Sequence, residues 1–488
     1  MNRRTFIHAA GATGLSLTSP VGFGATDRAV GGLVKLLEDS PRELIPRELV
    51  RLIRKDLRYE DLLAALALAA VRNVQPYPKV GYKYHSVMML RAVHSTTQHL
   101  SSADKWLPIA WAADYFKQTQ AEERDADGWR MPARAAASPG SAEAARHALS
   151  VALDHWDRDA ADAAIVNYAE LAHPQEIFSL LFSYGARDLR AIGHKAIAVS
   201  NAHFLIDVLG SAQVGPILRS TVAALQNSDA DPNPASHDLQ PDQPWRQNMQ
   251  RLHEIPQDWK QGRSDAGARA ELRAALYRVS EDQAGKVVVA LLRQGISPDA
   301  IWRVLFDTAA ELLMHESGIV PLHAQTTANA LYYAYRVCDD EPTQQLSLLQ
   351  CAAFIAMFRK LVGATPPEIG LEALQPLAPE TSGLDAIDEI FADVAAGRRL
   401  QAARKSLGYL QSGGNPQALI AKTRHHLVYN AQGPHDYKFS EAVFDSYAHF
   451  ANSDWQCRFL SAGMSYFKAP AKRPGPVVDE MLERLKPP

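Results

Sequence analysis

Residues 61–85 read DLLAALALAAVRNVQPYPKVGYKYH, and this stretch decides the fold. Its first part, residues 61–71, is a run of Leu and Ala that strongly favours a helix. The Pro-Tyr-Pro segment at 76–78 ends that helix, and Gly81 sets the entry to the next element. His85 then opens a second apolar stretch. The pattern therefore predicts an apolar helix, a break rich in Pro and Gly, and a histidine that starts the following helix.

The same unit recurs along the chain. Residues 299–323 repeat it at the same length, and two shorter versions end at His194 and His435. In each version an apolar helix stops at a Gly or Pro before the histidine appears. Internal similarity of this kind indicates one repeated structural unit. The four histidines that follow such a break are His85, His194, His323 and His435.

The remainder of the chain has the same helical character. Apolar residues recur at helical spacing in segments such as 301–314 and 346–361, and few stretches alternate with the period of a strand. We therefore expect an all-α fold, built as a large helical bundle or array of repeated helix–loop–helix units. A Pro-rich stretch near residue 240 divides the chain into two helical halves, 26–240 and 241–488, unless the two form one domain.

Composition limits the classes of function. The 488 residues carry a net charge of −3, which gives no overall attraction to nucleic acid. The three cysteines lack the spacing of a zinc ribbon and are too few for a disulfide framework. A Gly-rich phosphate loop, a GxSxG elbow and an HExxH motif are all absent from the sequence. Histidine is the unusual residue, with 17 copies.

The four histidines predict a metal site. A residue in the first turn of a buried helix has a well-defined direction, so four such helices packed together can aim four imidazoles at one point. Neutral imidazole is the commonest nitrogen ligand of transition metals in proteins. A helical-repeat binding protein without catalysis is the alternative. It would place the four histidines about one repeat apart along the array, with separations well beyond about 10 Å, too far apart to share one ion.

The N-terminus resembles an export signal. Arg3 and Arg4 precede a short, weakly apolar stretch, as in a twin-arginine signal, and residues 1–25 are expected to form this signal peptide. That route carries folded proteins, often with a cofactor already inserted. The sequence thus predicts an exported, periplasmic protein that the twin-arginine translocase recognises. No later apolar run reaches 18 residues, so we expect no stable membrane span.

Short motifs around the histidines resemble those of the questin oxidase-like family, whose fungal members open or oxidise anthraquinone-type rings. The resemblance spans residues 50–470 in broad outline and rests on three motifs: Gly193-His194-Lys195, Leu322-His323-Ala324 and His435-Asp436-Tyr437-Lys438-Phe439. It implies an all-helical enzyme with one non-haem iron, held by four histidines and a lysine carboxylated on its amine. Val320 and Tyr84 stand where the family often has further histidines. The ligands it implies are His85, His194, His323, His435 and Lys438.

The spacing of His435 and Lys438 is compatible with this ligand set. Residues three apart on a helix share a face. A buried lysine readily loses its proton, and the neutral amine can add carbon dioxide to give an anionic oxygen ligand. The alternative is a partly exposed lysine that pairs with Asp436 or Glu441.

These observations predict an exported oxidoreductase. We expect a metal-dependent mono- or dioxygenase, with Fe(II) as cofactor, that uses dioxygen on an aromatic or conjugated small molecule. Lys438, Tyr437 and Asp436 are the candidate catalytic residues, and Asp436 or Tyr437 is expected to orient a ligand imidazole. A zinc-dependent hydrolase that uses the same histidines is the alternative enzyme.

Overall fold

A computed structural model describes most of the chain. The described residues are 28–76, 80–102, 104–134, 140–187, 189–210, 214–226, 232–363, 370–450, 453–467 and 474–486. The predicted signal peptide, residues 1–25, lies outside them. Within these ranges the chain forms helices and no strand, with one isolated bridge between Arg263 and Ile296. The all-α prediction is therefore confirmed.

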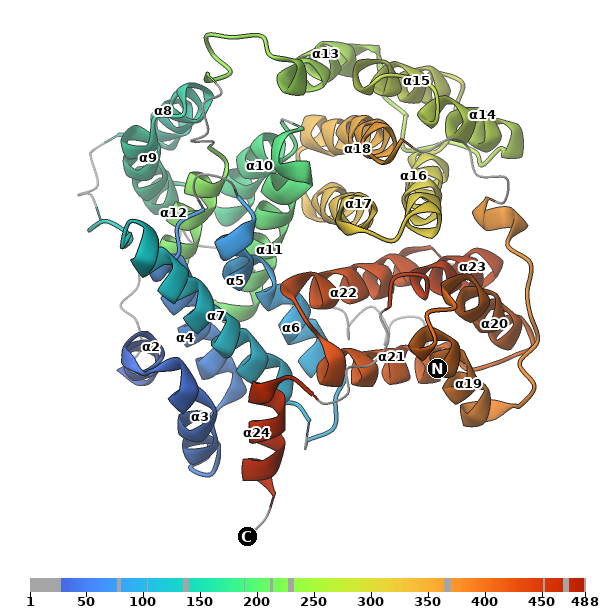
Figure 1. Cartoon of the computed structure of the whole chain (residues 1–488). Helices are drawn as coiled ribbons and strands as arrows, with labels where there is room; N and C mark the ends of the chain where they lie inside the picture. The colour runs from blue at the N-terminus through green and yellow to red at the C-terminus, as the bar shows by residue number, and fades with distance from the viewer. Residues whose placement is uncertain are drawn as a thin grey trace.

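Four helical segments form a closed ring at the centre of the molecule (Figure 1). One segment contains two short helices in succession, α5 and α6, and the others are single helices. The first segment and α11 pack together, α11 packs on α17, α17 on α22, and α22 returns to α6. The bounds are α5 (His85–Met88), α6 (Leu90–Thr97), α11 (His194–Leu209), α17 (Ile319–Val337) and α22 (Pro434–His449).

Each segment of the ring follows an apolar helix across a short break, so the predicted repeat is present in the structure. The preceding helices are α4 (Tyr59–Asn73), α10 (Pro174–Gly185), α16 (Pro298–His315) and α21 (Pro416–Asn430). Two of the breaks contain 3-10 turns immediately before the histidine, η3 (Tyr82–Tyr84) and η4 (Arg190–Gly193). Two segments of the ring come from before residue 240 and two from after it.

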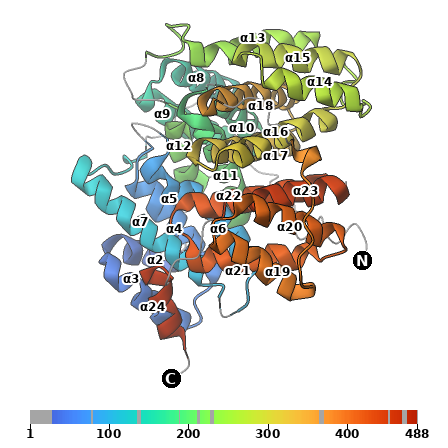
Figure 2. The same cartoon turned by 45° about the vertical axis from the view of Figure 1, so that its right-hand side comes forward.

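Outer helices surround the ring on all sides (Figure 2). The first group in chain order is α2 (Arg28–Asp39), α3 (Ile45–Ile53) and α7 (Leu107–Ala126), joined by α24 (Pro476–Leu485). The next is α8 (Ala142–His155), α9 (Arg158–Leu171) and α12 (Val214–Ala224). A third is α13 (Gln243–Arg251), α14 (Ala266–Leu276), α15 (Glu281–Arg293) and α18 (Glu341–Val362). The last is α19 (Gly383–Ala395), α20 (Arg399–Gln411) and α23 (Ser453–Gly463).

Local sequence explains where many of these helices begin. Side chains of Ser141, Asp157, Asp265 and Ser297 each accept a hydrogen bond from a backbone N–H in the first turn of their helix. Such caps satisfy N–H groups that have no partner within the helix. The main apolar core runs from helix α2 to helix α24 and so includes residues on both sides of position 240. A second core lies among α8 to α12.

Helix α18 has the length and apolar composition of a membrane span. Its most apolar 18-residue window is 78% buried inside the protein. A buried core helix of a soluble protein meets the same two criteria, so the helix by itself is weak support for a span.

Candidate metal centre

The backbone brings each of the four predicted histidines to the same end of the central ring. His85 and His194 are the first residues of α5 and α11, and His435 is the second residue of α22. His323 differs from the prediction, because α17 begins at Ile319 and the histidine lies one turn inside it. Pro321 sits within that first turn, where a missing N–H costs no helical hydrogen bond.

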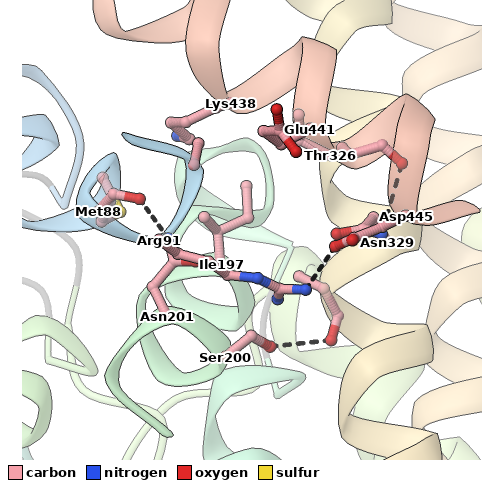
Figure 3. A pocket seen from close by; sticks show the side chains of 13 residues that line it. Met88, Arg91, Ile197, Ser200, Asn201, Thr326, Asn329, Lys438, Glu441 and Asp445 are labelled. Carbon is pink, nitrogen blue, oxygen red and sulfur yellow. Dashed lines mark hydrogen bonds and ion pairs between the residues drawn. The ribbon is translucent and has the colours of Figure 1, made fainter. Parts of the chain in front are cut away.

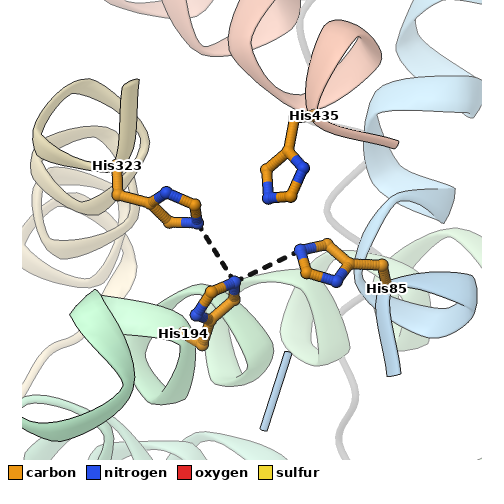
Figure 4. Close-up of side chains that lie close together, drawn as sticks. All are labelled: His85, His194, His323 and His435. Atoms are coloured by element: carbon orange, nitrogen blue, oxygen red, sulfur yellow. Dashed lines mark hydrogen bonds between the residues drawn. The ribbon is translucent and has the colours of Figure 1, made fainter. Parts of the chain in front are cut away.

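The four side chains converge on one point (Figure 4). One ligand nitrogen from each histidine lies within 4.8 Å of all the others. The Nε2 atom of His194 is 3.2 Å from Nε2 of His85 and 3.1 Å from Nε2 of His323. The rings of His85 and His435 have centroids 4.4 Å apart. Since metal–imidazole bonds are about 2 Å long, nitrogens at these separations can reach a single ion. The histidines are therefore not spread along the array, as a repeat without a shared site would place them.

Backbone carbonyls fix the orientation of three of the rings. Nδ1 of His85 lies 2.8 Å from the carbonyl oxygen of Tyr82, and Nδ1 of His194 lies 2.6 Å from that of Ala191. Nδ1 of His323 lies 2.6 Å from the carbonyl oxygen of Ile319. A carbonyl only accepts, so each Nδ1 carries the proton and each Nε2 keeps its lone pair for the centre of the cluster. Metal-binding histidines are commonly held in this way.

The turn before His194 has an unusual backbone. Ala191, Ile192 and Gly193 have φ values of 52°, 45° and 81°, which are left-handed conformations that L residues rarely adopt. A side chain at Gly193 would also overlap the side chain of Thr327 on α17. Strained backbone of this kind persists only where surrounding contacts impose it, and it clusters at functional sites. Here it places the Ala191 carbonyl against the His194 ring.

The electrostatic environment keeps three of the imidazoles neutral. His85, His194 and His323 are 3%, 6% and 0% exposed, whereas His435 is partly exposed. Burial lowers the pKa of His85 and His194 well below 6.5, and the nearby charge of Lys438 lowers it further. The same two causes lower the pKa of His323 to about 3. Neutral imidazoles are the form that binds a cation, so proton competition is weak at this site.

Lys438 lies beside the cluster and is buried. Lys438 lies one helical turn after His435 on α22. Its charge lowers the pKa of His85, His194 and His323. Its Nζ has no hydrogen-bond partner among the described residues, and burial lowers its pKa to about 7. The predicted alternative, an exposed lysine paired with Asp436 or Glu441, is not what the structure shows. Glu441 instead receives two hydrogen bonds from Arg424.

Asp436 and Tyr437 lie on α22 but point to other partners. The Asp436 carboxylate accepts hydrogen bonds from the backbone N–H groups of Gln432 and Gly433, and from the hydroxyl of Tyr466 at 2.8 Å. These contacts fasten the start of the helix. Tyr437 is fully buried, and its ring packs against Trp111 with centroids 5.2 Å apart. Neither residue shows a hydrogen bond to a histidine of the cluster in the described contacts.

Sequence reasoning did not identify two features of the site. The carbonyls that orient the rings stand three or four residues before each histidine, where side-chain identity gives no signal. Gly193 packs closely against Thr327 of another repeat. The only sequence signal of this contact is the glycine before His194. A further histidine on α11, His203, is partly buried and lies outside the cluster, with its ring against Phe178.

Comparisons of the chain with protein-family models, with curated proteins and with solved structures found no match. Four buried or partly buried histidines lie close together, with three rings held by carbonyls and a lysine amine at the edge of the cluster. This arrangement can bind a metal ion, and the donor set of neutral nitrogens suits a transition metal.

Proposed function

We propose that this protein is a metal-dependent oxidoreductase, a mononuclear non-haem iron oxygenase that acts on an aromatic or conjugated small molecule. The convergence of one ring nitrogen from each of the four histidines is the observation that carries the proposal. The four imidazoles lie on helices, and in His85, His194 and His323 the Nδ1 proton points away from the centre of the cluster. Such an arrangement is typical of a preorganised metal site. Iron(II), when bound, would supply the activation of dioxygen.

Lys438 favours a catalytic ion over a closed structural one. Four histidines alone would satisfy a tetrahedral zinc ion. A protonated lysine beside the same ion would repel it, and the buried amine has no other partner in the described structure. Since its pKa is lowered to about 7, the amine is largely neutral above that pH and can add carbon dioxide. The resulting carbamate would bring one negative charge and a fifth ligand, which leaves room for a sixth on an octahedral ion.

The resemblance to the questin oxidase-like family agrees with this proposal. All five residues implied by the short motifs lie together: His85, His194, His323, His435 and Lys438. We propose the family membership on that basis, together with the carboxylation of Lys438. Export by the twin-arginine translocase to the periplasm is proposed from Arg3 and Arg4 alone.

Metal content is the decisive test. The protein is purified without chelators, and its iron and zinc are measured by elemental analysis and by anomalous scattering at both absorption edges. We expect close to one iron per chain, lost on the substitution His194→Ala. His203→Ala is the matched control, because His203 lies on the same helix, α11, and outside the cluster. Folded wild-type protein that takes up no metal would contradict the proposal.

Carboxylation and turnover are tested separately. Labelled bicarbonate should give a carbamate signal in the carbon-13 NMR spectrum of the wild-type protein and none in Lys438→Met. Dioxygen consumption is then followed with a panel of quinones and polyphenols. Zinc at the site with hydrolysis of an ester panel, and no dioxygen uptake, would favour the hydrolase instead.

A further inference from the structure

A small cavity lies on the axis of the central ring, one helical turn beyond the histidines (Figure 3). The residues that line it follow a rule. Each of the four segments contributes the positions three, six and seven residues after its histidine. Residues three and seven apart lie on one face of a helix, so the face that carries the histidine also faces the cavity. The cavity and the metal centre thus lie one after the other along the same axis, and the residues three positions after the histidines stand between them.

The layer nearest the histidines consists of the residues three positions after them. These are Met88, Ile197, Thr326 and Lys438, and each is nearly or fully buried. Met88 is unbranched and flexible, so this layer can yield to a small molecule without movement of the helices. Lys438 belongs to both the cluster and the cavity wall.

An ion pair lies at the outer end of the cavity. Arg91 on α6 contacts Asp445 on α22 at 2.5 Å, and their side chains are 14% and 34% exposed. The guanidinium also lies 4.4 Å from the ring centroid of Tyr333. This pair joins two neighbouring helices of the ring and lies farthest from the histidines among the lining residues. Opening this end requires the guanidinium to leave both Asp445 and the Tyr333 ring.

The size of the cavity limits what it can hold. Its volume is about 30 Å³, and a cavity needs about 10–15 Å³ on this scale to hold one water molecule. It therefore has room for two water molecules or one diatomic molecule, and an aromatic ring is excluded. Ala92, Ala330 and Ala442 supply methyl groups to its wall. Both carboxylates of the wall are already paired, Asp445 with Arg91 and Glu441 with Arg424, so the cavity favours a neutral guest over an ion.

We propose that this axial cavity is the entry route and holding site for a neutral diatomic molecule, dioxygen, with Arg91 and Asp445 as its outer gate. The proposal rests on the proposed function, because it assigns the route of the second substrate to the same metal centre. The two substrates would then follow different paths. Dioxygen would enter along the axis of the central ring, and the organic substrate would reach the metal from another direction.

Nitric oxide is the probe for the route. Its second-order rate of binding to the iron(II)-loaded protein is measured by stopped-flow absorbance. Ala330→Leu and Ala92→Val fill the cavity from different helices, and each should slow binding by at least about tenfold with iron content unchanged. Arg91→Met removes the gate and should raise the rate about threefold. Ala334→Leu controls for overpacking on α17 outside the cavity, and Arg42→Met controls for loss of an ion pair elsewhere.

Unchanged rates in the filled variants and in Arg91→Met, at full iron content, would overturn the proposal. A xenon-pressurised crystal of the metal-free protein supplies a measurement that needs neither iron nor the variants. Xenon density between Met88, Ile197 and Ala330 supports the holding site, and its absence there contradicts it. Failure of the proposed function would appear differently, as wild-type protein that binds no iron whatever the xenon experiment shows.

Discussion

Two buried lysines in this protein have opposite surroundings. Lys117 on α7 is 3% exposed, and its Nζ donates to the carbonyl oxygens of Leu37 and Glu38 and to the side chain of Gln120. These contacts cap the C-terminal end of α2, where the helix dipole favours a positive charge. Lys438 is 6% exposed and has no hydrogen-bond partner among the described residues. Burial lowers the pKa of both, to about 8 and about 7. A lowered pKa alone therefore does not distinguish a structural lysine from a reactive one, whereas the contacts of the amine do.

Exchange of each lysine for methionine tests this contrast most strongly. Lys438→Met should lower the affinity for iron by at least about 100-fold, because it removes a ligand and leaves the fold intact. Lys117→Met should leave iron binding unchanged and lower the free energy of unfolding by about 1–3 kcal/mol per orphaned carbonyl. Iron titration and urea unfolding of both variants measure the two effects.

Equal effects of Lys438→Met and Lys117→Met on iron affinity and stability would contradict the distinction between a reactive and a structural lysine. Equal iron affinity in both would remove Lys438 from the site, and a large loss of stability in Lys438→Met would show that its amine has a structural partner. Replacement of an unpaired buried amine by an apolar side chain is expected to be neutral or stabilising.

Gly193→Ala should be the most destabilising single change near the site. The new methyl group would overlap the side chain of Thr327, and φ at this position is 81°. We expect a loss of about 3 kcal/mol, or less if the turn relaxes and His194 moves with it. Gly210→Ala is the control, since that glycine also has positive φ but no atom within 4 Å of an added methyl group. Thermal unfolding and iron content distinguish the two outcomes.

The two lysines also predict how stability changes with pH. Between pH 7 and 10.5 the folded, metal-free protein holds fewer protons at Lys438 than the unfolded chain does. The free energy of unfolding should therefore rise with pH across this window, by at most about 1.4 kcal/mol per unit. Below pH 7 this contribution is constant. Lys117 adds a similar rise above pH 8. Unfolding measured at several pH values should show a shallower rise in Lys438→Met, and an identical slope would count against the burial of a free amine.

The smallest expected effect concerns Asp436, a satisfied polar group on the same helix as Lys438. Asp436→Asn keeps one acceptor oxygen but weakens the contacts to Gln432 and Gly433. We expect a loss of about 1 kcal/mol in stability. Iron affinity should stay within twofold of wild type if Asp436 acts only as a cap. A larger loss of affinity would return it to the candidate catalytic residues.

Sequence patterns predicted the helices and the cluster because both depend on local rules. Runs such as residues 61–71 define helices by composition, and Gly or Pro before each histidine marks a helix start. Four repeats of that mark indicated convergence of the side chains. The short-motif resemblance added Lys438, which the spacing from His435 made plausible but did not require.

The remaining features differ in how local their signals are. The start of α17 at Ile319, four residues before its histidine, follows from the first turn accommodating Pro321. The cap formed by Asp436 has a local signal, an acidic residue three positions after Gly433, which can be recognised as a helix start. The gate between Arg91 and Asp445 has no such signal, because it depends on how α6 and α22 pack.

The left-handed turn at residues 191–193 has a consequence for how the protein acquires its ion. With that turn locked against α17, the His194 ring has no freedom left to lose when a cation arrives. The conformational entropy of this side chain is lost when the chain folds. Metal binding therefore requires little further loss of conformational entropy at His194. Loading should then be quick and reversible in the fully folded protein, which would allow the ion to be exchanged during the lifetime of one molecule.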